Sequence, residues 1–249
     1  MKTLALEFYK CRRRWVWLAP LVMLAAQLAW GLWSFRNMSE AELQEGWCNI
    51  LYTFPLLNAM MTPIVAAIVA SRIADIEHKG QTLKLLETVQ TAGSLFCAKF
   101  LCSVCYMAAY LLLQTAVMVI FGVLHGFVGP LPTVEIALYF VAVLLVTTVL
   151  VLFQLILSLL IPNQMIGMIF GLIGSFAGLF SLFFPTAVQK CIPWGYYGVL
   201  HVAAMDWNEQ TRVTHYYFTS FDMRSLCVAA VFLVVLYCIG RRLFVRKEV

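Results

Sequence analysis

Charged residues are scarce in this sequence. Asp, Glu, Lys and Arg make up only 12% of its 249 residues, whereas hydrophobic residues make up 63%. A soluble globular domain carries about 25% charged residues and about half apolar ones. Because a water-soluble fold of this length has no means of covering so much apolar surface, the composition excludes that class. It indicates a protein whose solvent is the lipid bilayer.

The common motifs for catalysis and nucleotide binding are missing as well. The sequence has no G-x-x-x-x-G-K-[ST] phosphate-binding loop, no G-x-S-x-G motif and no H-E-x-x-H motif. Its long apolar runs contain none of the Asp, Glu, Lys, Arg or His residues that mark proton relays and catalytic sites within membranes. We therefore expect a chain that is not an enzyme and that binds no metal or cofactor itself.

The long apolar runs predict six membrane-spanning helices. A hydrocarbon core of about 30 Å requires about 20 helical residues. The turn signal Pro162-Asn163-Gln164 divides the longest uncharged stretch into two crossings. The chain is therefore predicted to be an all-α polytopic membrane protein with a single domain over residues 1–249. Its predicted spans are residues 15–35, 50–71, 100–124, 136–161, 165–189 and 224–242.

Lysine and arginine divide unequally between the two sides of this arrangement. Thirteen of the 17 lie at the two chain ends or between the second and third spans, and only four lie on the other side. Basic residues concentrate in cytoplasmic loops. We therefore expect a multi-pass protein of the plasma membrane with both termini in the cytoplasm. Because this distribution matches membrane orientation, the net charge of +5 does not indicate that the protein binds nucleic acid.

The residues before the first span have an amphipathic pattern. Leu4, Phe8 and Cys11 share one helical face, and Glu7, Lys10 and the arginines lie elsewhere. This spacing predicts a lead-in helix at the membrane interface. A simple basic anchor is the alternative.

The longest loop on the predicted outer side, residues 190–223, is rich in tryptophan and tyrosine. These side chains favour the headgroup region, so we interpret the loop as interfacial and partly re-entrant. The eight cysteines are dispersed, and Cys102-x-x-Cys105 sits in an apolar run, which favours free thiols over a zinc or redox site. Cys48 and Cys191 alone lie on the outer side of the predicted membrane, and the sequence leaves open whether they are bonded.

The cytoplasmic segment between the second and third spans is the most informative part of the chain. Charged residues alternate there with isoleucine and leucine, which predicts an amphipathic helix over about residues 73–89. Such a helix either lies on the lipid surface or docks on a soluble partner that supplies energy.

The motif Glu77-x-x-Gly80-x-Thr82-Leu83-x-Leu85-Leu86-x-Thr88, followed by Lys99, resembles the cytoplasmic loop of type-2 ABC transporter permeases. The family usually has a proline shortly after the threonine, where this chain has Val89-Gln90. The resemblance implies six spans and a coupling helix that docks on a separate ATPase, which binds ATP and Mg. It also implies pairing with a second permease subunit, identical or different. The residues expected to dock on the ATPase are Asp75, Glu77, Gly80, Thr82, Leu83, Lys84, Leu86 and Thr88.

The fifth span carries a stripe of glycines, Gly167, Gly171, Gly174 and Gly178, at positions i, i+4, i+7 and i+11. Small residues let two helices approach closely in lipid. The contact is either within the chain or between subunits. In the family that the chain resembles, the first and fifth spans line the dimer contact, which favours an intersubunit role.

In its size and its lack of a fused ATPase, the chain resembles the lantibiotic-immunity permeases, which expel antimicrobial peptides from the membrane. We therefore predict a permease subunit of an exporter for amphipathic antimicrobial peptides, in contact with membrane lipids. Alternatives within the exporters are another drug, a lipid or an ion as substrate. A non-transporting peptide sensor or scaffold is a further alternative. An intramembrane enzyme is disfavoured by the missing catalytic residues.

Reporter fusions test the predicted topology. A reporter fused after Val249 should lie in the cytoplasm, and one inserted within residues 40–45 should lie on the opposite side, because the basic residues favour the side with the termini. A C-terminus on the outer side would contradict the six-span arrangement.

Overall fold

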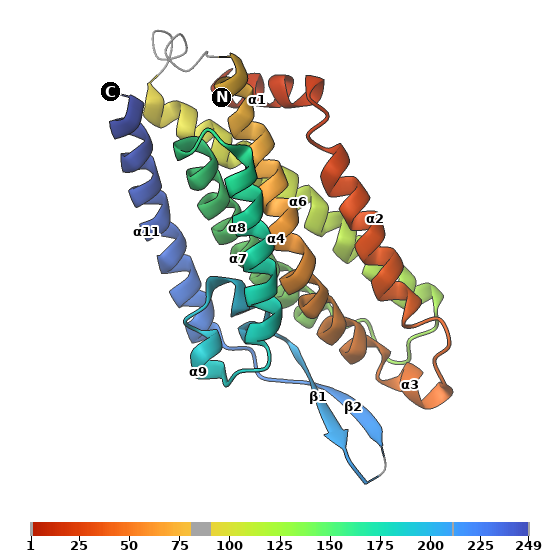
Figure 1. Ribbon diagram of the computed structural model, residues 1–249. Helices are drawn as coiled ribbons and strands as arrows, with labels where there is room; N and C mark the ends of the chain where they lie inside the picture. The colour runs from red at the N-terminus through yellow and green to blue at the C-terminus, as the bar shows by residue number, and fades with distance from the viewer. Residues whose placement is uncertain (1, 81–90, 211, 249) are drawn as a thin grey trace.

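The computed structural model describes residues 2–80, 91–210 and 212–248 and forms a bundle of long helices (Figure 1). Within these residues, five helices are long and apolar enough to cross a membrane, which confirms the all-α polytopic class. Both termini lie at one end of the bundle, which we call the terminal end, and a two-stranded sheet marks the opposite, hairpin end (Figure 1). The five helices are α4 (Gly46–Gly80), α6 (Ala92–Leu124), α7 (Thr133–Leu160), α8 (Gln164–Ser181) and α11 (Met223–Glu248).

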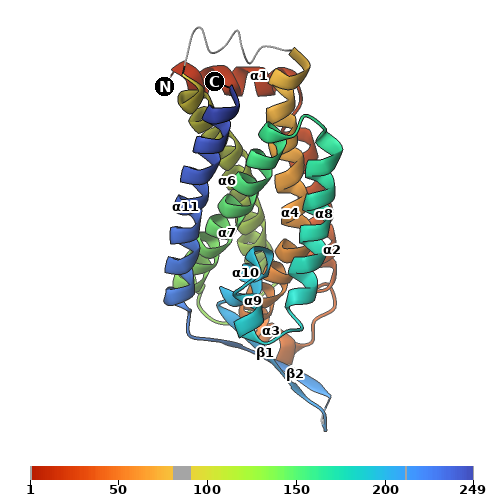
Figure 2. The ribbon, with the colours of Figure 1, turned by 60° about the vertical axis from the view of Figure 1, so that its left-hand side comes forward.

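The first predicted span corresponds to two helices that meet at a sharp bend. These helices, α1 (Lys2–Arg13) and α2 (Leu18–Trp33), are inclined to each other by 71°. The 16 residues of α2 rise about 24 Å, which is less than the hydrocarbon core. Taken as one bent span, the pair gives a sixth crossing. α1 lies across the terminal end, while α2 runs along the bundle (Figure 2).

Two predicted boundaries are corrected by the structure. α8 ends at Ser181 rather than at residue 189, because the chain turns ahead of Pro185 and the residue before a proline disfavours helix. α4 continues past residue 71 to Gly80 without a break, so residues 73–80 of the predicted coupling helix belong to the same helix as the second span. The rest of that predicted helix, residues 81–89, lies outside the described residues.

The glycine stripe of α8 packs inside the chain. A Cβ built at Gly171 would overlap the Cβ of Ala67 on α4, and one at Gly178 would lie 3.0 Å from the Ala59 carbonyl oxygen. A Cβ at Gly174 would overlap the indole nitrogen of Trp194. The four glycines are buried within the chain against α4, Trp194 and, for Gly167, Ser158 of α7, which favours the packing role; the intersubunit role stays a prediction.

The chain after α8 folds back into the bundle through α9 (Thr186–Gln189), the 3-10 helix η1 (Pro193–Gly195) and α10 (Tyr196–Val199). Tyr197 is buried, and its hydroxyl shares a 2.9 Å hydrogen bond with Thr147 of α7. The Trp194 ring packs edge-on against Phe153 with 5.6 Å between the ring centroids. This part of the loop is therefore a support for α7 and α8.

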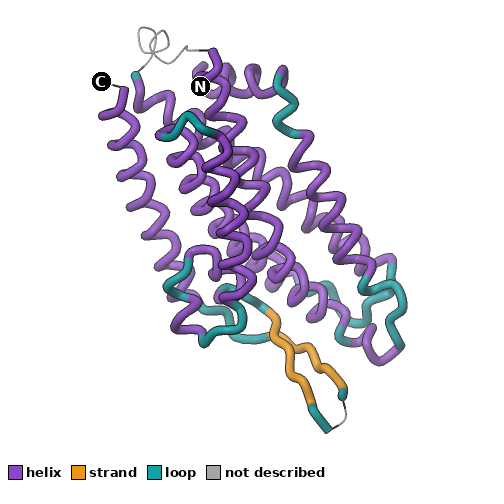
Figure 3. The backbone as a smooth tube through the Cα atoms, in the orientation of Figure 1, coloured by secondary structure: helices purple, strands orange, loops and turns teal. Residues whose placement is uncertain are grey.

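The rest of the loop contains an antiparallel hairpin of β1 (Ala203–Asn208) and β2 (Val213–Phe218), shown in Figure 3. The register pairs Ala203 with Phe218 and Asn208 with Val213. A carboxylate oxygen of Glu45 accepts the Tyr216 backbone N–H at 2.7 Å, and the other lies 3.0 Å from Nδ1 of His215. The interpretation of residues 190–223 as a loop misses this hairpin, although the β-branched and aromatic run of residues 213–218 is typical of a strand.

Substitution of Gly174 tests the packing of the stripe. Gly174→Leu should lower the melting temperature in detergent, because overpacking of a filled site typically costs about 1–3 kcal/mol. Trp194→Ala should restore part of the loss in the double variant, since it removes the overlapping indole.

The matched control is Ile173→Leu on the exposed face of the same helix, which should leave the melting temperature unchanged. A Gly174→Leu chain that melts normally but fails to dimerise would show that the stripe serves a subunit contact instead.

Candidate functional site

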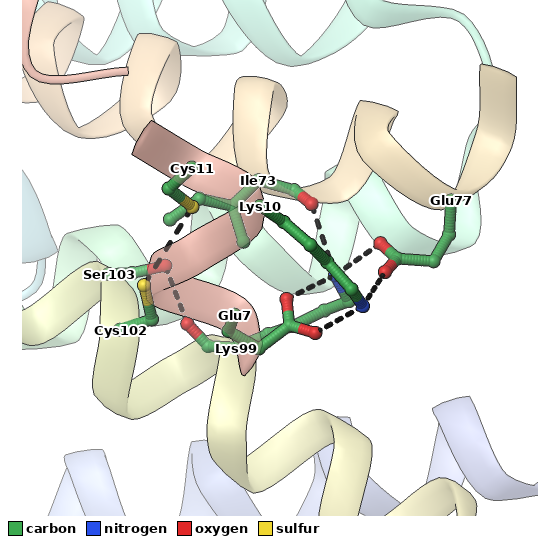
Figure 4. Close-up of polar contacts among 8 residues, drawn as sticks. All are labelled: Glu7, Lys10, Cys11, Ile73, Glu77, Lys99, Cys102 and Ser103. Carbon is green, nitrogen blue, oxygen red and sulfur yellow. Dashed lines mark hydrogen bonds and ion pairs between the residues drawn. The ribbon is translucent and has the colours of Figure 1, made fainter. Parts of the chain in front are cut away.

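Four charged side chains meet where α1 crosses α4 and α6 at the terminal end (Figure 4). Glu7 and Lys10 come from α1, Glu77 from the end of α4 and Lys99 from the start of α6. The side chains of Glu7, Glu77 and Lys99 are at most 1% exposed, and that of Lys10 is 25% exposed. We call these four residues the charge cluster.

Every donor of the Lys99 ammonium has an acceptor. Its Nζ donates to Oε2 of Glu7 at 2.9 Å, to the Ile73 carbonyl oxygen at 3.1 Å and to a carboxylate oxygen of Glu77. Lys10 Nζ donates to Oε1 of Glu7 at 2.7 Å and to Oε1 of Glu77 at 2.8 Å. Each carboxylate therefore contacts both ammonium groups, and the cluster has no net charge (Figure 4).

Helix periodicity explains how the local sequences present these groups. Glu7 and Lys10 are three residues apart, and Ile73 and Glu77 are four apart, so each pair lies on one helix face. Buried ions are costly to desolvate, and a set of well-packed apolar side chains can replace such a cluster without loss of stability. We therefore infer that the cluster determines which faces of α1, α4 and α6 meet, rather than adding net stability.

Several sequence-based expectations change at this site. The amphipathic pattern of α1 predicts Glu7 and Lys10 on a polar face, but Glu7 is buried. The apolar runs that predict the spans contain no Asp, Glu, Lys, Arg or His, but α6 begins at Ala92, so Lys99 lies inside a helix long enough to span. Glu77, expected to contact the ATPase, turns its carboxylate into the charge cluster.

The remaining predicted docking residues lie on both sides of the boundary of the described region. Asp75 is 9% exposed on α4, and Gly80 is the last residue of that helix. The other five, Thr82, Leu83, Lys84, Leu86 and Thr88, lie outside the described residues. Of the predicted docking residues, Glu77 is the one that belongs to the charge cluster, so the cluster includes part of the predicted coupling helix.

A second polar group, without formal charge, lies deeper in the bundle. Asn58 of α4 accepts from Gln27 of α2 at 2.9 Å and from Gln114 of α6 at 3.0 Å. Its Nδ2 donates to the hydroxyl of Tyr139 on α7 at 2.9 Å. All four side chains are buried. Because an unsatisfied amide in an apolar interior is costly, this network specifies how four helices meet without offering an acid or a base.

No metal or disulfide chemistry is assembled in the part of the chain that the structure describes. No group of three His, Cys, Asp or Glu side chains is arranged there to hold a metal ion. All eight cysteines are described, and all are free thiols, including Cys48 and Cys191, whose bonding the sequence left open.

Removal of one charge tests the cluster. Lys99→Met should destabilise the chain by about 3–5 kcal/mol, because it leaves buried carboxylates without their main partner. The measurement is thermal unfolding in detergent. Adding Glu7→Gln should recover part of the loss, since Lys10 and Glu77 then form a neutral pair. Lys190→Met is the control, because the Lys190–Asp222 pair is exposed to solvent and such pairs add little to stability. Equal losses for Lys99→Met and Lys190→Met would contradict this account.

Comparison with known proteins identifies the family. A family model described as "ABC-2 family transporter protein" matches residues 3–178, the part of the chain from α1 to α8 that carries the charge cluster and the neutral network. No curated protein and no solved structure matches the chain. The family match covers well over half of the sequence, and the matched part contains four of the five helices that are long and apolar enough to span a membrane. The chain therefore belongs to the ABC-2 transporter family, as a membrane permease subunit.

Proposed function

We propose that this permease subunit expels amphipathic antimicrobial peptides of the lantibiotic class from the membrane, using ATP hydrolysed with Mg by a separate ATPase subunit. The observation that carries the transport part is the family match over residues 3–178. The peptide part is supported by the largely apolar surface of the bundle. Such a surface suits a ligand that partitions into the bilayer better than it suits a hydrophilic ion.

An apolar cavity between α7 and α11 supports this substrate class. It has a volume of about 170 Å³ and is lined by Val149, Val228 and Phe232, with Lys190 and Tyr196 also in its wall. Ligand pockets combine mostly apolar walls with a few polar groups. A hydrophobic side chain of a membrane-bound peptide would enter here, with polar groups of the peptide near the ammonium.

The energy of transport would enter through residues 73–89. Leu83 and Leu86 would be the apolar anchors on the ATPase, and Lys84 would set the orientation by charge. Glu77 would act differently from the sequence-based expectation, since its buried carboxylate joins α4 to α1 and α6. A displacement of the coupling segment would then reach three helices together through the charge cluster.

The proposed assembly contains a second permease subunit, identical or different, and sits in the plasma membrane with both termini in the cytoplasm. The location of both termini at one end of the bundle supports this topology (Figure 1). Because the glycine stripe is occupied within the chain, the subunit contact would use the opposite face of α8. That face exposes Ile169, Phe176 and Phe180.

Two leucines in the coupling segment test the docking part. Leu83→Asp with Leu86→Asp should abolish co-purification of the ATPase and resistance of the cells to a lantibiotic, while membrane insertion is retained. Burial of two leucines is worth roughly 3–6 kcal/mol, enough to decide association.

The matched control is Gln81→Asp with Leu85→Asp, which adds the same charge to the opposite face of the predicted helix and should leave ATPase binding intact. Retained binding and full resistance in the double leucine variant would overturn the docking proposal. Peptide bound by the complex but not released on addition of ATP would instead favour a sensor.

A further inference from the structure

The junction between α1 and α2 has an unusual geometry. The two helices are inclined by 71°, and Trp15 adopts a φ of 52° within the turn. A bulky residue in the left-handed region is a strained conformation that the surrounding structure must maintain. The ring centroids of Trp15 and Trp17 lie 5.4 Å apart. Trp15 is 59% exposed and Trp17 is 40% exposed. We call residues 12–17 the elbow.

Four exposed guanidinium groups belong to this region. Arg12, Arg13 and Arg14 are consecutive in the elbow, and Arg72 of α4 places its Nη1 3.5 Å from the Arg14 carbonyl oxygen. Among the described residues, none of these four forms an ion pair with a carboxylate, in contrast to Lys10 and Lys99 of the charge cluster. The elbow therefore offers concentrated positive charge, with no carboxylate paired to it in the part of the chain that the structure describes.

An apolar groove includes a residue of the elbow, Trp17, in its wall. It lies between α2 and α6, has a volume of about 120 Å³ and starts at Trp17, three residues after Arg14. Leu21 and Leu113 of its walls are 47% and 51% exposed. The site thus combines a basic rim, exposed tryptophans and an apolar channel that runs along the spanning helices.

We propose that the elbow binds an anionic glycerophospholipid of the leaflet at the terminal end. The phosphate would be held by Arg14 and Arg72, whose forked guanidinium groups match phosphate oxygens, and one acyl chain would lie in the groove between α2 and α6. Trp15 and Trp17 would lie at headgroup depth. This lipid is a bound component of the permease rather than its transported peptide, so the inference goes beyond the proposed function.

Lipid binding to the delipidated full chain in detergent tests the site. Native mass spectrometry would follow titration with phosphatidylglycerol and, in parallel, phosphatidylcholine of the same chain length. Phosphatidylglycerol should bind more tightly. Each basic residue near an anionic lipid strengthens its binding roughly fivefold, so Arg14→Gln with Arg72→Gln should weaken it roughly 25-fold. The matched control is Arg242→Gln with Arg246→Gln, which removes the same charge from exposed positions of α11 at the same end of the bundle.

The groove is tested separately from the charge. Ala109→Phe fills the groove between α2 and α6 and should weaken binding of both lipids, whereas Ala116→Phe fills a different groove between α6 and α7 and should not. An equal loss in the two double arginine variants would overturn the site, because it would indicate general surface charge. Unchanged binding in Ala109→Phe would overturn it as well. Neither measurement requires an ATPase or a peptide, so failure of the transport proposal would not affect them.

Discussion

The burial of Glu7, Glu77 and Lys99 at one point is the constraint on which the terminal end of this protein depends. An unpaired charge in that position costs several kcal/mol, so α1, α4 and α6 must meet with their charged groups in contact. Apolar contacts do not select one helix arrangement so strongly in a membrane, because lipid tails solvate an apolar helix surface as well as another helix does. The charge cluster therefore gives three helices one defined arrangement near the end of α4 and the start of α6.

Within the bundle, two further sets of contacts, which carry no charge, join the helices. The amide and hydroxyl network around Asn58 joins α2, α4, α6 and α7, and the glycines of α8 allow α4 to approach closely. Both kinds of contact are directional or close-packed, so neither leaves much freedom for helices to slide. A displacement applied at the terminal end would then move helices as bodies, which is the behaviour that a permease driven by a soluble ATPase needs.

Composition and charge distribution were sufficient to predict the membrane class and the joint location of the two termini. The glycine stripe was recognised as a packing surface, but its partner was not, because only the fold shows that Trp194 returns from a loop to fill it. The charge cluster was not predictable from spacing, since Glu7, Glu77 and Lys99 are separated by 22 to 92 residues. Each of them, taken alone, looks like a charge at the edge of a membrane segment. The hairpin was missed for a different reason, because its aromatic residues also fit an interfacial loop.

If the charge cluster carries force from the ATPase into the helices, the most direct measurement is the amount of peptide transported per ATP hydrolysed in proteoliposomes. The variant for this measurement is Glu7→Gln with Lys99→Met, which keeps the cluster neutral but removes the charged contacts of α6 with α1 and α4. The account predicts that the ATPase still binds and hydrolyses ATP, while the transport ratio falls severalfold. A ratio equal to that of the unchanged protein would contradict it.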